Sequence, residues 1–446
     1  MSKKNQFNEQ HITVYLILTN QMKGESMSEN HNLNKKSGEI SFRDIPFSSY
    51  KIFFICLIGV TFANLDHQIF ILVQGSLSKF FGWTPQDFGL YSAITFLVSG
   101  FLCSQIGVIS DRMGRKKSLL VSTLLTPLFV AYLAFAPNTV AVLIARTLGF
   151  TTAGAQSPIT LTTVTESSPA RFRGLFTGIL QIGFPLGAAL AALLISLILN
   201  EDGSNFQYTF LLALLFLPYG WIIHKYLPES KAWLDAQKNK KESDPKVSTL
   251  ILFKPKWRRK SLLLFAGQFL YAFAYGSTFL LPFYLQLDRA FTETEAISMV
   301  GQAYAIGSLG YIVAAVVGEF FISRRNTIVL WALLGGCAFT ALIWLAQTPA
   351  QIILTFSMMS FFFYGAYAVM ATFIAENFPA ELRATAASFS GTLAINSGFG
   401  LGPLAIGIAS ASFGWNEGFT IIAIAPIILA AIIFMFLKPV PREEVF

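Results

Sequence analysis

Residues 188–199 read Ala-Ala-Leu-Ala-Ala-Leu-Leu-Ile-Ser-Leu-Ile-Leu, with one hydroxyl group and no charge. They belong to a longer apolar stretch, residues 174–199, which is long enough to cross a hydrocarbon layer about 30 Å thick. Lipid offers the backbone no hydrogen-bond partners, so a spanning segment must be a helix or part of a closed barrel. Barrel strands alternate apolar and polar residues, and this run does not. It therefore predicts a transmembrane helix.

Similar runs recur along most of the chain. Of its 446 residues 54% are hydrophobic and 13% are charged, against about 25% charged in ordinary soluble domains. This composition excludes a soluble globule, and the 44 phenylalanines exclude a disordered chain. We therefore expect an all-α, polytopic membrane protein with twelve transmembrane helices, at residues 52–75, 87–108, 117–136, 139–163, 174–199, 206–226, 260–285, 295–318, 326–346, 350–374, 384–411 and 416–437.

The placement of lysine and arginine predicts the orientation, because cytoplasmic loops carry an excess of both. With the N-terminus inside, the outer loops contain only Lys79 and Arg289. Both termini are therefore expected in the cytoplasm, and the membrane is expected to be the plasma (inner) membrane. The net charge of +8 needs no nucleic-acid partner, since residues 225–260 alone hold eleven basic and four acidic residues.

The basic segment also divides the chain. Residues 1–45 are polar and are expected to form a flexible cytoplasmic tail without a removable signal peptide. Six spans follow at 46–226, then a basic cytoplasmic linker at 227–259, six more spans at 260–437 and a short tail at 438–446. The predicted domains are thus an N-terminal and a C-terminal six-helix bundle.

An internal repeat supports this division. The segments Glu166-Ser-Ser-Pro-Ala-Arg-Phe-Arg173 and Glu376-Asn-Phe-Pro-Ala-Glu-Leu-Arg383 both read E-x-x-P-A-x-x-R and follow the fourth and tenth spans. A displacement of six spans puts both copies on the same side of the membrane. The repeat is therefore parallel, with its axis along the membrane normal.

The loop after the second span has a distinct motif, Gly107-Val-Ile-Ser-Asp111-Arg112-Met-Gly114-Arg115 followed by two lysines. Gly107 allows close helix approach, Gly114 permits a tight turn, and the basic cluster suits a surface beside anionic lipid. Simple obedience to the positive-inside rule is the alternative, but it would require neither Asp111 nor the two glycines.

This motif, G-x-x-x-D-R-x-G-R-K-K, resembles the signature of major facilitator superfamily transporters, and the span count and repeat extend the resemblance over residues 46–437. Residues 227–234, Leu-Pro-Glu-Ser-Lys-Ala-Trp-Leu, and residues 166–187 resemble the sugar-porter and sialate/lactate proton-symporter branches. The resemblance implies two bundles that rock about a central site and expose it alternately to each side.

The resemblance also implies ion-pair clasps at the inner mouth, which close it when the site faces outward. A single solvated pair contributes only about 0–1 kcal/mol, so a gate needs a cooperative network. Ordinary surface pairs without a gating role are the alternative. The charged residues concerned are Asp111 and Arg115 with Glu166 and Arg173, and Glu376 with Arg383.

Three charged residues fall within the predicted spans, where charge is costly and marks a functional candidate. At 1.5 Å per residue, Asp66 lies roughly 21 Å above the inner edge of the first span. Arg146 lies roughly 10 Å below the outer edge of the fourth. The two therefore share nearly one depth. Glu319, near Arg324 and Arg325 at the end of the eighth span, is expected in an interfacial ion pair, with a coupling role as the alternative.

An acid and a guanidinium at one depth neutralise each other, which lowers the cost of burying both. Protonation of the acid would release the arginine and bias the conformation. In proton-coupled sugar porters the resemblance implies such a pair, so we predict Asp66 as the proton carrier and Arg146 as its partner. A static structural pair and contact between Arg146 and a substrate carboxylate stay open. His67 is expected to be an exposed or hydrogen-bonded neighbour, or to have a role in proton passage.

The substrate site is predicted from uncharged polar residues within the spans. Gln268, Tyr271 and Tyr275 fall on one stripe of the seventh span. Uncharged donors and aromatic rings suit a small polar, partly hydroxylated or aromatic solute, whereas polar contacts between helices are the alternative. The candidate substrate-binding residues are Gln156, Gln181, Gln268, Tyr271, Tyr275 and Asn396.

The sequence contains no intramembrane HExxH, paired aspartates or Ser/His combination, so we expect no enzyme, no metal and no cofactor. The predicted function is proton-coupled uptake of a small polar organic solute such as a monocarboxylate, a sugar acid or a sugar. The expected partners are the solute, protons and the lipid bilayer, and the chain is expected to act as a monomer. Proton-driven efflux of drugs or metabolites, and a non-transporting nutrient sensor, are the alternatives.

Overall fold

The computed structural model describes residues 45–229, 233–234 and 249–440, and the side chains of residues 104–112, 170, 380, 381 and 384 lie outside that description. The expected N-terminal tail, most of the basic linker and the last residues of the chain also lie outside it. The described part is helical, and no β-strand occurs in it.

Six spans form each half. The N-terminal half contains α2 (Phe47–Leu72), α3 (Gln74–Phe81), α4 (Pro85–Met113), α5 (Arg115–Tyr132), η3 (Leu133–Phe135), α6 (Thr139–Ser167), η4 (Ala170–Phe172), α7 (Arg173–Leu180), α8 (Gly183–Ser196), α9 (Gln207–Leu211), η5 (Leu212–Phe216) and α10 (Tyr219–Tyr226). The C-terminal half contains η6 (Thr249–Phe253), α12 (Pro255–Ser277), η7 (Thr278–Leu280), α13 (Leu281–Leu287), α14 (Glu293–Val316), η8 (Val317–Phe321), α15 (Arg324–Thr340), η9 (Ala341–Leu345), α16 (Pro349–Met359), η10 (Ser360–Tyr364), α17 (Tyr367–Glu376), α18 (Ala380–Ala386), η11 (Ala387–Leu393), α19 (Ala394–Phe413), α20 (Trp415–Phe419), η12 (Thr420–Ile424) and α21 (Ala425–Met435).

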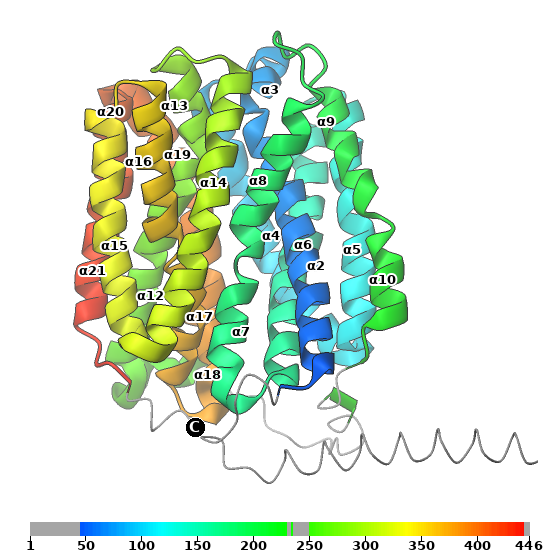
Figure 1. Cartoon of the computed structure of the whole chain (residues 1–446), viewed down its shortest axis with the longest axis vertical. Coiled ribbons are helices and arrows are strands. Elements are labelled where there is room, and N and C mark those ends of the chain that lie inside the picture. The colour runs from blue at the N-terminus through cyan, green and yellow to red at the C-terminus, as the bar shows by residue number, and fades with distance from the viewer. Residues whose placement is uncertain (1–44, 230–232, 235–248, 441–446) are drawn as a thin grey trace, which may run out of the picture.

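The helices run side by side as one upright bundle (Figure 1). Within the described residues, ten spans are long and apolar enough by composition to cross a membrane, and α4 and α6 are the remaining two. The expected polytopic, all-α membrane fold is therefore confirmed. The end that carries α18 is called the inner end below, after the predicted orientation, and the end that carries α3 is called the outer end.

Local sequence explains where the helices break and begin. Proline lacks a backbone N–H and clashes with the carbonyl group four residues earlier, and accordingly α7 gives way to α8 just before Pro185 and η5 gives way to α10 at Pro218. The start of α14 is fixed by a capping box, in which Thr292 and Glu295 each satisfy the other's backbone N–H.

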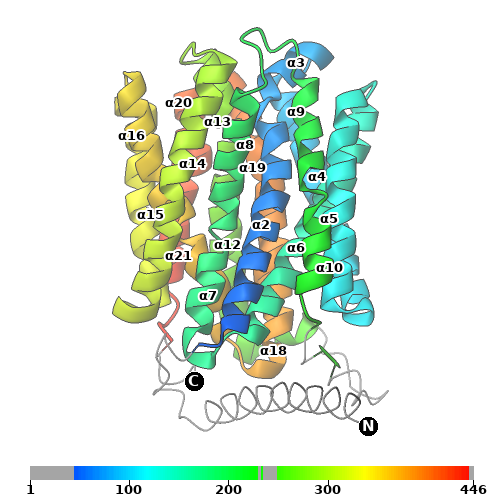
Figure 2. The ribbon, with the colours of Figure 1, turned by 45° about the vertical axis from the view of Figure 1, so that its right-hand side comes forward.

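The two halves meet along two pairs of helices, α4 with α19 and α8 with α14 (Figure 2). Glycines let the backbones approach closely. A Cβ atom added to Gly89 of α4 would lie 2.5 Å from the carbonyl oxygen of Pro403 in α19, and one added to Gly407 of α19 would lie 2.8 Å from that of Pro85. Side chains at either glycine would push the halves apart.

The halves also touch at the outer end. There the backbone N–H of Ser76 in α3 donates to Oε1 of Glu293 at 2.9 Å, and the Ser76 hydroxyl donates to Oε2. Deeper in the bundle, Nε2 of Gln74 donates to the carbonyl oxygen of Phe279 at 3.3 Å. These three bonds join α3 of the first half to elements of the second.

Similar contacts join the halves near the inner end. The hydroxyl groups of Thr177 in α7 and Thr372 in α17 lie 3.5 Å apart. A Cβ atom on Gly178 would lie 2.8 Å from the carbonyl oxygen of Ala368. The described parts of the two halves therefore meet at both ends, and this arrangement is called the closed form below.

Candidate functional site

Arg146 lies in the middle of the first half and is 6% exposed. Its Nη2 donates to Nδ1 of His67 in α2 at 2.6 Å, and its guanidinium lies 4.3 Å from the centre of the Phe70 ring. An arginine can only donate, so Nδ1 of His67 must be the acceptor, which assigns the ring proton to Nε2. A buried cation is thus held by a neutral imidazole and an aromatic face.

Asp66 is buried as well, at 3% exposed. Within the described residues its Oδ1 atom has no hydrogen-bond partner, and no ion pair joins it to Arg146. The two charges therefore act on each other without the direct contact that an ion pair would make. Consecutive residues of a helix point about 100° apart, and His67, rather than Asp66, reaches the guanidinium from α2.

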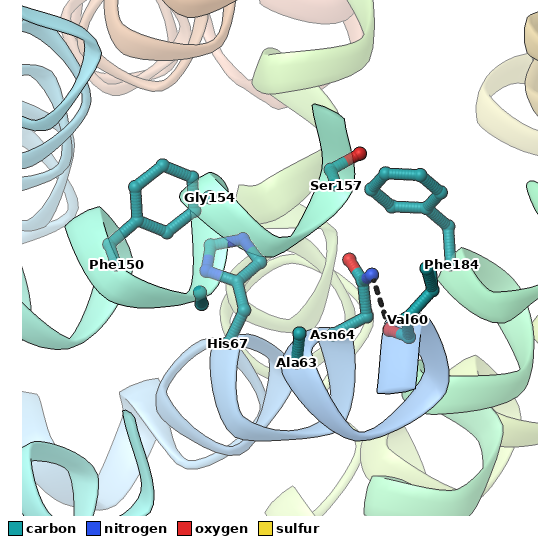
Figure 3. Close-up of a pocket in the computed structure, with 9 residues that line it drawn as sticks. Val60, Ala63, Asn64, His67, Phe150, Gly154, Ser157 and Phe184 are labelled. Atoms are coloured by element: carbon teal, nitrogen blue, oxygen red, sulfur yellow. Dashed lines mark hydrogen bonds between the residues drawn. The ribbon is translucent and has the colours of Figure 1, made fainter. Parts of the chain in front are cut away.

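A small pocket opens beside His67 within the first half (Figure 3). Three polar side chains face it, Asn64 and His67 from α2 and Ser157 from α6, and Asn64 donates to the carbonyl oxygen of Val60 at 2.8 Å. The other lining residues are apolar or lack a side chain. The full lining is Val60, Ala63, Asn64, His67, Phe150, Ala153, Gly154, Ser157 and Phe184.

An aromatic cluster continues from His67 across the boundary between the halves. The imidazole lies 5.0 Å from the ring of Phe150, and 5.6 Å from the rings of Phe96 and of Phe279 in η7. Phe96 stacks on Phe279 with an angle of 14° between the rings, and Phe399 of α19 meets both. The site near Arg146 is therefore walled by aromatic rings from both halves.

Tyrosines extend this cluster into the second half. Tyr275 lies 5.1 Å from Phe399, 4.3 Å from Tyr364 and 5.4 Å from Tyr367, measured between ring centres. Tyr271 is fully buried, and its hydroxyl is used by a bond of 2.5 Å to the carbonyl oxygen of Phe363. The predicted residues Tyr271 and Tyr275 thus lie in one uncharged, aromatic region.

Two polar groups near these tyrosines lack partners in the described part of the chain. Gln268 is 1% exposed, and neither its amide nitrogen nor its amide oxygen is hydrogen-bonded. The hydroxyl of Tyr367 is also buried without a hydrogen-bond partner among the described residues. Buried polar groups are normally satisfied, so both are suited to meet a polar group of a bound solute.

The other three candidate substrate residues serve contacts within the protein. Gln156 exchanges long hydrogen bonds with Thr123 and Thr126 of α5, at 3.4 and 3.3 Å. Gln181 is the residue at the C-terminal end of α7, where its backbone N–H donates to the carbonyl oxygens of Gly178 and Ile179. Asn396 packs against Gly100 of α4, since a Cβ atom on that glycine would lie 2.9 Å from the Cβ of Asn396.

A three-residue ion cluster lies at the inner end of the second half. Arg324, the first residue of α15, pairs with Glu319 at 2.5 Å and also with Glu376 of α17. The interfacial pair expected for Glu319 is therefore present. The direct partner of Glu376 is Arg324, whereas Arg383 acts on it only from a longer distance, and Nε of Arg383 donates to the carbonyl oxygen of Phe378 at 3.3 Å.

This cluster touches the first half through a glycine. A Cβ atom on Gly174, in the first turn of α7, would lie 2.5 Å from Nη2 of Arg324 and 2.6 Å from Oε2 of Glu319. Gly174 directly follows the first copy of the repeated motif. The glycine that follows the motif therefore lets the backbone of α7 pack directly against the ion cluster of the opposite half.

The loop motif of the first half is described in part. Gly114 has φ of +97°, a conformation that glycine adopts readily, and a Cβ atom there would lie 2.4 Å from Oε2 of Glu229. Oε1 of Glu229 accepts from the backbone N–H groups of Arg115 and Lys116 at 2.8 and 3.2 Å, which caps α5. The side-chain positions of three predicted gate residues, Gly107, Asp111 and Arg112, lie outside the described residues.

The remaining gate residues lie at the ends of helices. Glu166 is exposed near the C-terminal end of α6, and Arg173 is exposed at the start of α7. Among the ion pairs of the described residues, none involves Arg173.

The sequence predicted an ion pair for Glu319 beside Arg324, but it did not predict three other partnerships: Arg324 with Glu376, Glu229 with the start of α5, and His67 with Arg146. Arg324 and Glu229 were visible as charges beside recognised motifs, but their contacts join segments far apart in the chain. The acceptor role of His67 was suggested only by its position next to Asp66.

Comparison with known proteins agrees with this architecture. Residues 54–394 and 298–445 match the sequence profile described as Major Facilitator Superfamily. A niacin transporter of Acinetobacter baylyi is 26% identical over 86% of this chain and 92% of its own length. The cis,cis-muconate transport protein of the same organism is 24% identical over 87% and 95%, and a gallate transporter of Pseudomonas putida is 26% identical over 77% and 82%.

Among solved structures, the inward-facing, occupied form of a bacterial homologue of the human lysosomal transporter Spinster superimposes with a TM-score of 0.67. It is 15% identical in sequence and covers 88% of this chain and 97% of its own. This likeness concerns the fold alone.

Proposed function

Since the chain belongs to the major facilitator superfamily, we propose that it takes up a small aromatic or unsaturated carboxylic acid together with a proton, by alternating access. Members of this family carry solutes, and the relatives named above are transporters of small organic compounds. The narrower proposal, a carboxylate and a proton, rests on the residues around Arg146.

The main support for a carboxylate substrate is the buried Arg146 guanidinium, which donates a hydrogen bond to the neutral imidazole of His67. A guanidinium presents two parallel N–H groups that match a carboxylate, and the bond gains strength where water is excluded. His67 contributes to the pocket wall, so a solute in that pocket lies beside the Arg146 site. We assign Arg146 as the group that binds the solute carboxylate.

The surrounding rings favour an unsaturated or aromatic body for the solute. Phe96, Phe150, Phe279 and Phe399 offer flat faces and edges that pack well against another ring. A sugar would need many hydrogen-bonding groups, and the described wall near His67 supplies few. Gln268 and Tyr367 then supply polar contacts for a hydroxyl group or ring nitrogen at the far end of the solute.

Asp66 is proposed as the proton carrier. A carboxylic acid within the bundle, with an oxygen atom that lacks a partner in the described structure, is costly to keep charged. An anionic solute adds a second negative charge next to it. Proton binding at Asp66 would keep the loaded site close to neutral, which couples solute entry to proton entry.

The contacts at both ends supply the gates. Opening the outer end must break the bonds of Ser76 with Glu293, and opening the inner end must lift Gly174 from the cluster of Glu319 and Arg324. A solute that stabilises the closed form lowers the barrier between the two open forms.

A thermal-shift screen of purified protein tests the class of solute, because a ligand that binds only the folded protein raises its stability. Nicotinate, cis,cis-muconate and gallate should raise the unfolding temperature, whereas nicotinamide and simple sugars should not. Uptake of the stabilising acid into proteoliposomes should then require an acidic exterior. Stabilisation by sugars alone would refute the proposal.

Two alternatives predict different flux. An exporter driven by protons would accumulate solute in inside-out vesicles and not in right-side-out ones. A sensor without turnover would bind the acid but show no counterflow of labelled solute.

A further inference from the structure

The closed structure poses a problem for the return of the empty transporter. Arg146 is 6% exposed, and a buried cation without an acceptor strongly destabilises the form that buries it. When solute is bound, its carboxylate supplies the acceptor. The empty protein must bury the same cation with no solute present, in order to carry its site back across the membrane.

Asp66 is near enough for its charge to act on Arg146, but in the described structure no ion pair joins the two, so Asp66 does not accept a hydrogen bond from the guanidinium. The acceptor is His67, whose Nδ1 lies 2.6 Å from Nη2 of Arg146. The imidazole is 8% exposed and lies among the rings of Phe96, Phe150 and Phe279, which hold it in place. It is a neutral group that accepts one hydrogen bond from the guanidinium.

We propose that His67 takes the place of the solute carboxylate on Arg146 when the transporter is empty, and so allows the empty protein to close and return. This inference rests on the proposed function, in which the carboxylate binds Arg146. The entering carboxylate displaces the imidazole because a charge-assisted, two-pronged bond is stronger than one bond to a neutral nitrogen. On release, His67 again accepts from Arg146.

The consequence concerns which transport modes need His67. Exchange of solute across the membrane uses only loaded, closed forms, so it does not require an internal acceptor. Net flux needs one return of the empty protein for each solute carried. Loss of the acceptor at position 67 should therefore lower net flux more than exchange, whereas a merely structural role would lower both alike.

Matched substitutions separate the acceptor from the shape. His67→Asn places a side-chain carbonyl oxygen where Nδ1 lies. His67→Leu introduces a side chain similar in shape to asparagine but without a hydrogen-bond acceptor. His67→Phe removes the acceptor but keeps the volume of a ring among Phe96, Phe150 and Phe279. The two acceptor-free variants guard against a fold that tolerates only one of them.

The experiment compares counterflow with net downhill efflux in proteoliposomes, using the acid identified by thermal shift. Net efflux by the Leu and Phe variants should fall by about tenfold or more relative to counterflow, because closure then leaves a buried donor unpaired. The Asn variant should keep the wild-type ratio. These results would support the inference.

Other outcomes overturn it. An unchanged ratio in the Leu or Phe variant, or loss of counterflow and net efflux together, excludes a role specific to the empty protein. Failure of the proposed function is distinct, because the wild-type protein would then exchange none of the tested acids.

Discussion

Ser76 and Glu293 join the two halves of the molecule at its outer end, through bonds from the serine's backbone N–H and hydroxyl group to the two carboxylate oxygens. The carboxylate is 7% exposed and lies at the first turn of α14. Small residues surround it, since a Cβ atom on Gly75 would lie 2.9 Å from Oε1 and one on Gly203 would lie 3.1 Å from Oε2. The contact therefore joins the two halves at the outer end, where we propose a gate.

Replacement of Glu293 by alanine is expected to favour the form that is open to the outside. The closed form would then leave the N–H and hydroxyl groups of Ser76 unpaired, at a cost of about 1–3 kcal/mol. A cysteine at Ala93, which is buried on α4 and packs against Gly400 of α19, should react about tenfold faster with an external maleimide.

This labelling requires a background in which Cys56, Cys103 and Cys337 are replaced by serine. Glu295→Ala is the matched control, because that glutamate belongs to the same helix turn but bonds only to Thr292 of its own half. Equal labelling rates in the Glu293 and Glu295 variants would contradict an outer gate.

Replacement of Arg146 by methionine should abolish carboxylate binding. Truncation of one partner of a buried charge pair weakens binding by about a hundredfold or more. Lysine should restore little, since it keeps the charge but lacks the planar fork. Titration calorimetry with the stabilising acid measures both variants, and Lys79→Met, at an exposed position, controls for loss of charge. Wild-type affinity in the methionine variant would disprove the assignment.

Asp66→Asn should uncouple solute from protons. The asparagine carries no titratable proton, so an inward proton gradient should no longer drive accumulation, while downhill uptake and counterflow continue. The measurement is uptake into proteoliposomes at a series of external pH values with a fixed internal pH. Accumulation that follows the gradient as in the wild type would remove Asp66 as the proton carrier.

Gly174→Val should hold the inner end open. The added side chain would overlap the ion cluster, because even a Cβ atom would lie within 2.6 Å of Arg324 and Glu319. Uptake should fall several-fold, and a cysteine at Thr372 should label faster in inside-out vesicles. Gly391→Val is the control, since a Cβ atom there meets nothing within 4 Å. Similar behaviour of both valine variants would argue against an inner gate at Gly174.

The fold could be predicted from sequence because the membrane leaves so few choices. Backbone groups in lipid must bond within their own segment, so apolar runs of sufficient length are helices. The predicted helix ends are less accurate where a helix extends beyond the apolar run into a charged segment. The seventh span begins at Pro255 rather than at residue 260, because a basic turn that precedes the apolar run is helical too.

The partners of the charged residues could not be predicted in the same way. Distance along a span gives the depth of Asp66 and Arg146 but not the direction in which each points around its helix. The residue of α2 that forms a hydrogen bond with Arg146 is His67, one position after the predicted Asp66. At the inner end, the family resemblance implied Arg383 as the partner of Glu376, whereas the packing of α15 brings Arg324 into direct contact with it.

The two sides of the central aromatic cluster differ in chemistry, and this difference affects how the substrate specificity of such a protein can change. The described titratable charges near the middle of the bundle, Asp66 and Arg146, lie on α2 and α6, whereas the facing wall from α12 and α17 offers tyrosines and a glutamine. If Asp66 and Arg146 have the proposed roles, mutations in the second wall can alter the range of accepted compounds and leave these two groups intact. Related transporters with different substrate specificities would then differ mainly in one of their two halves.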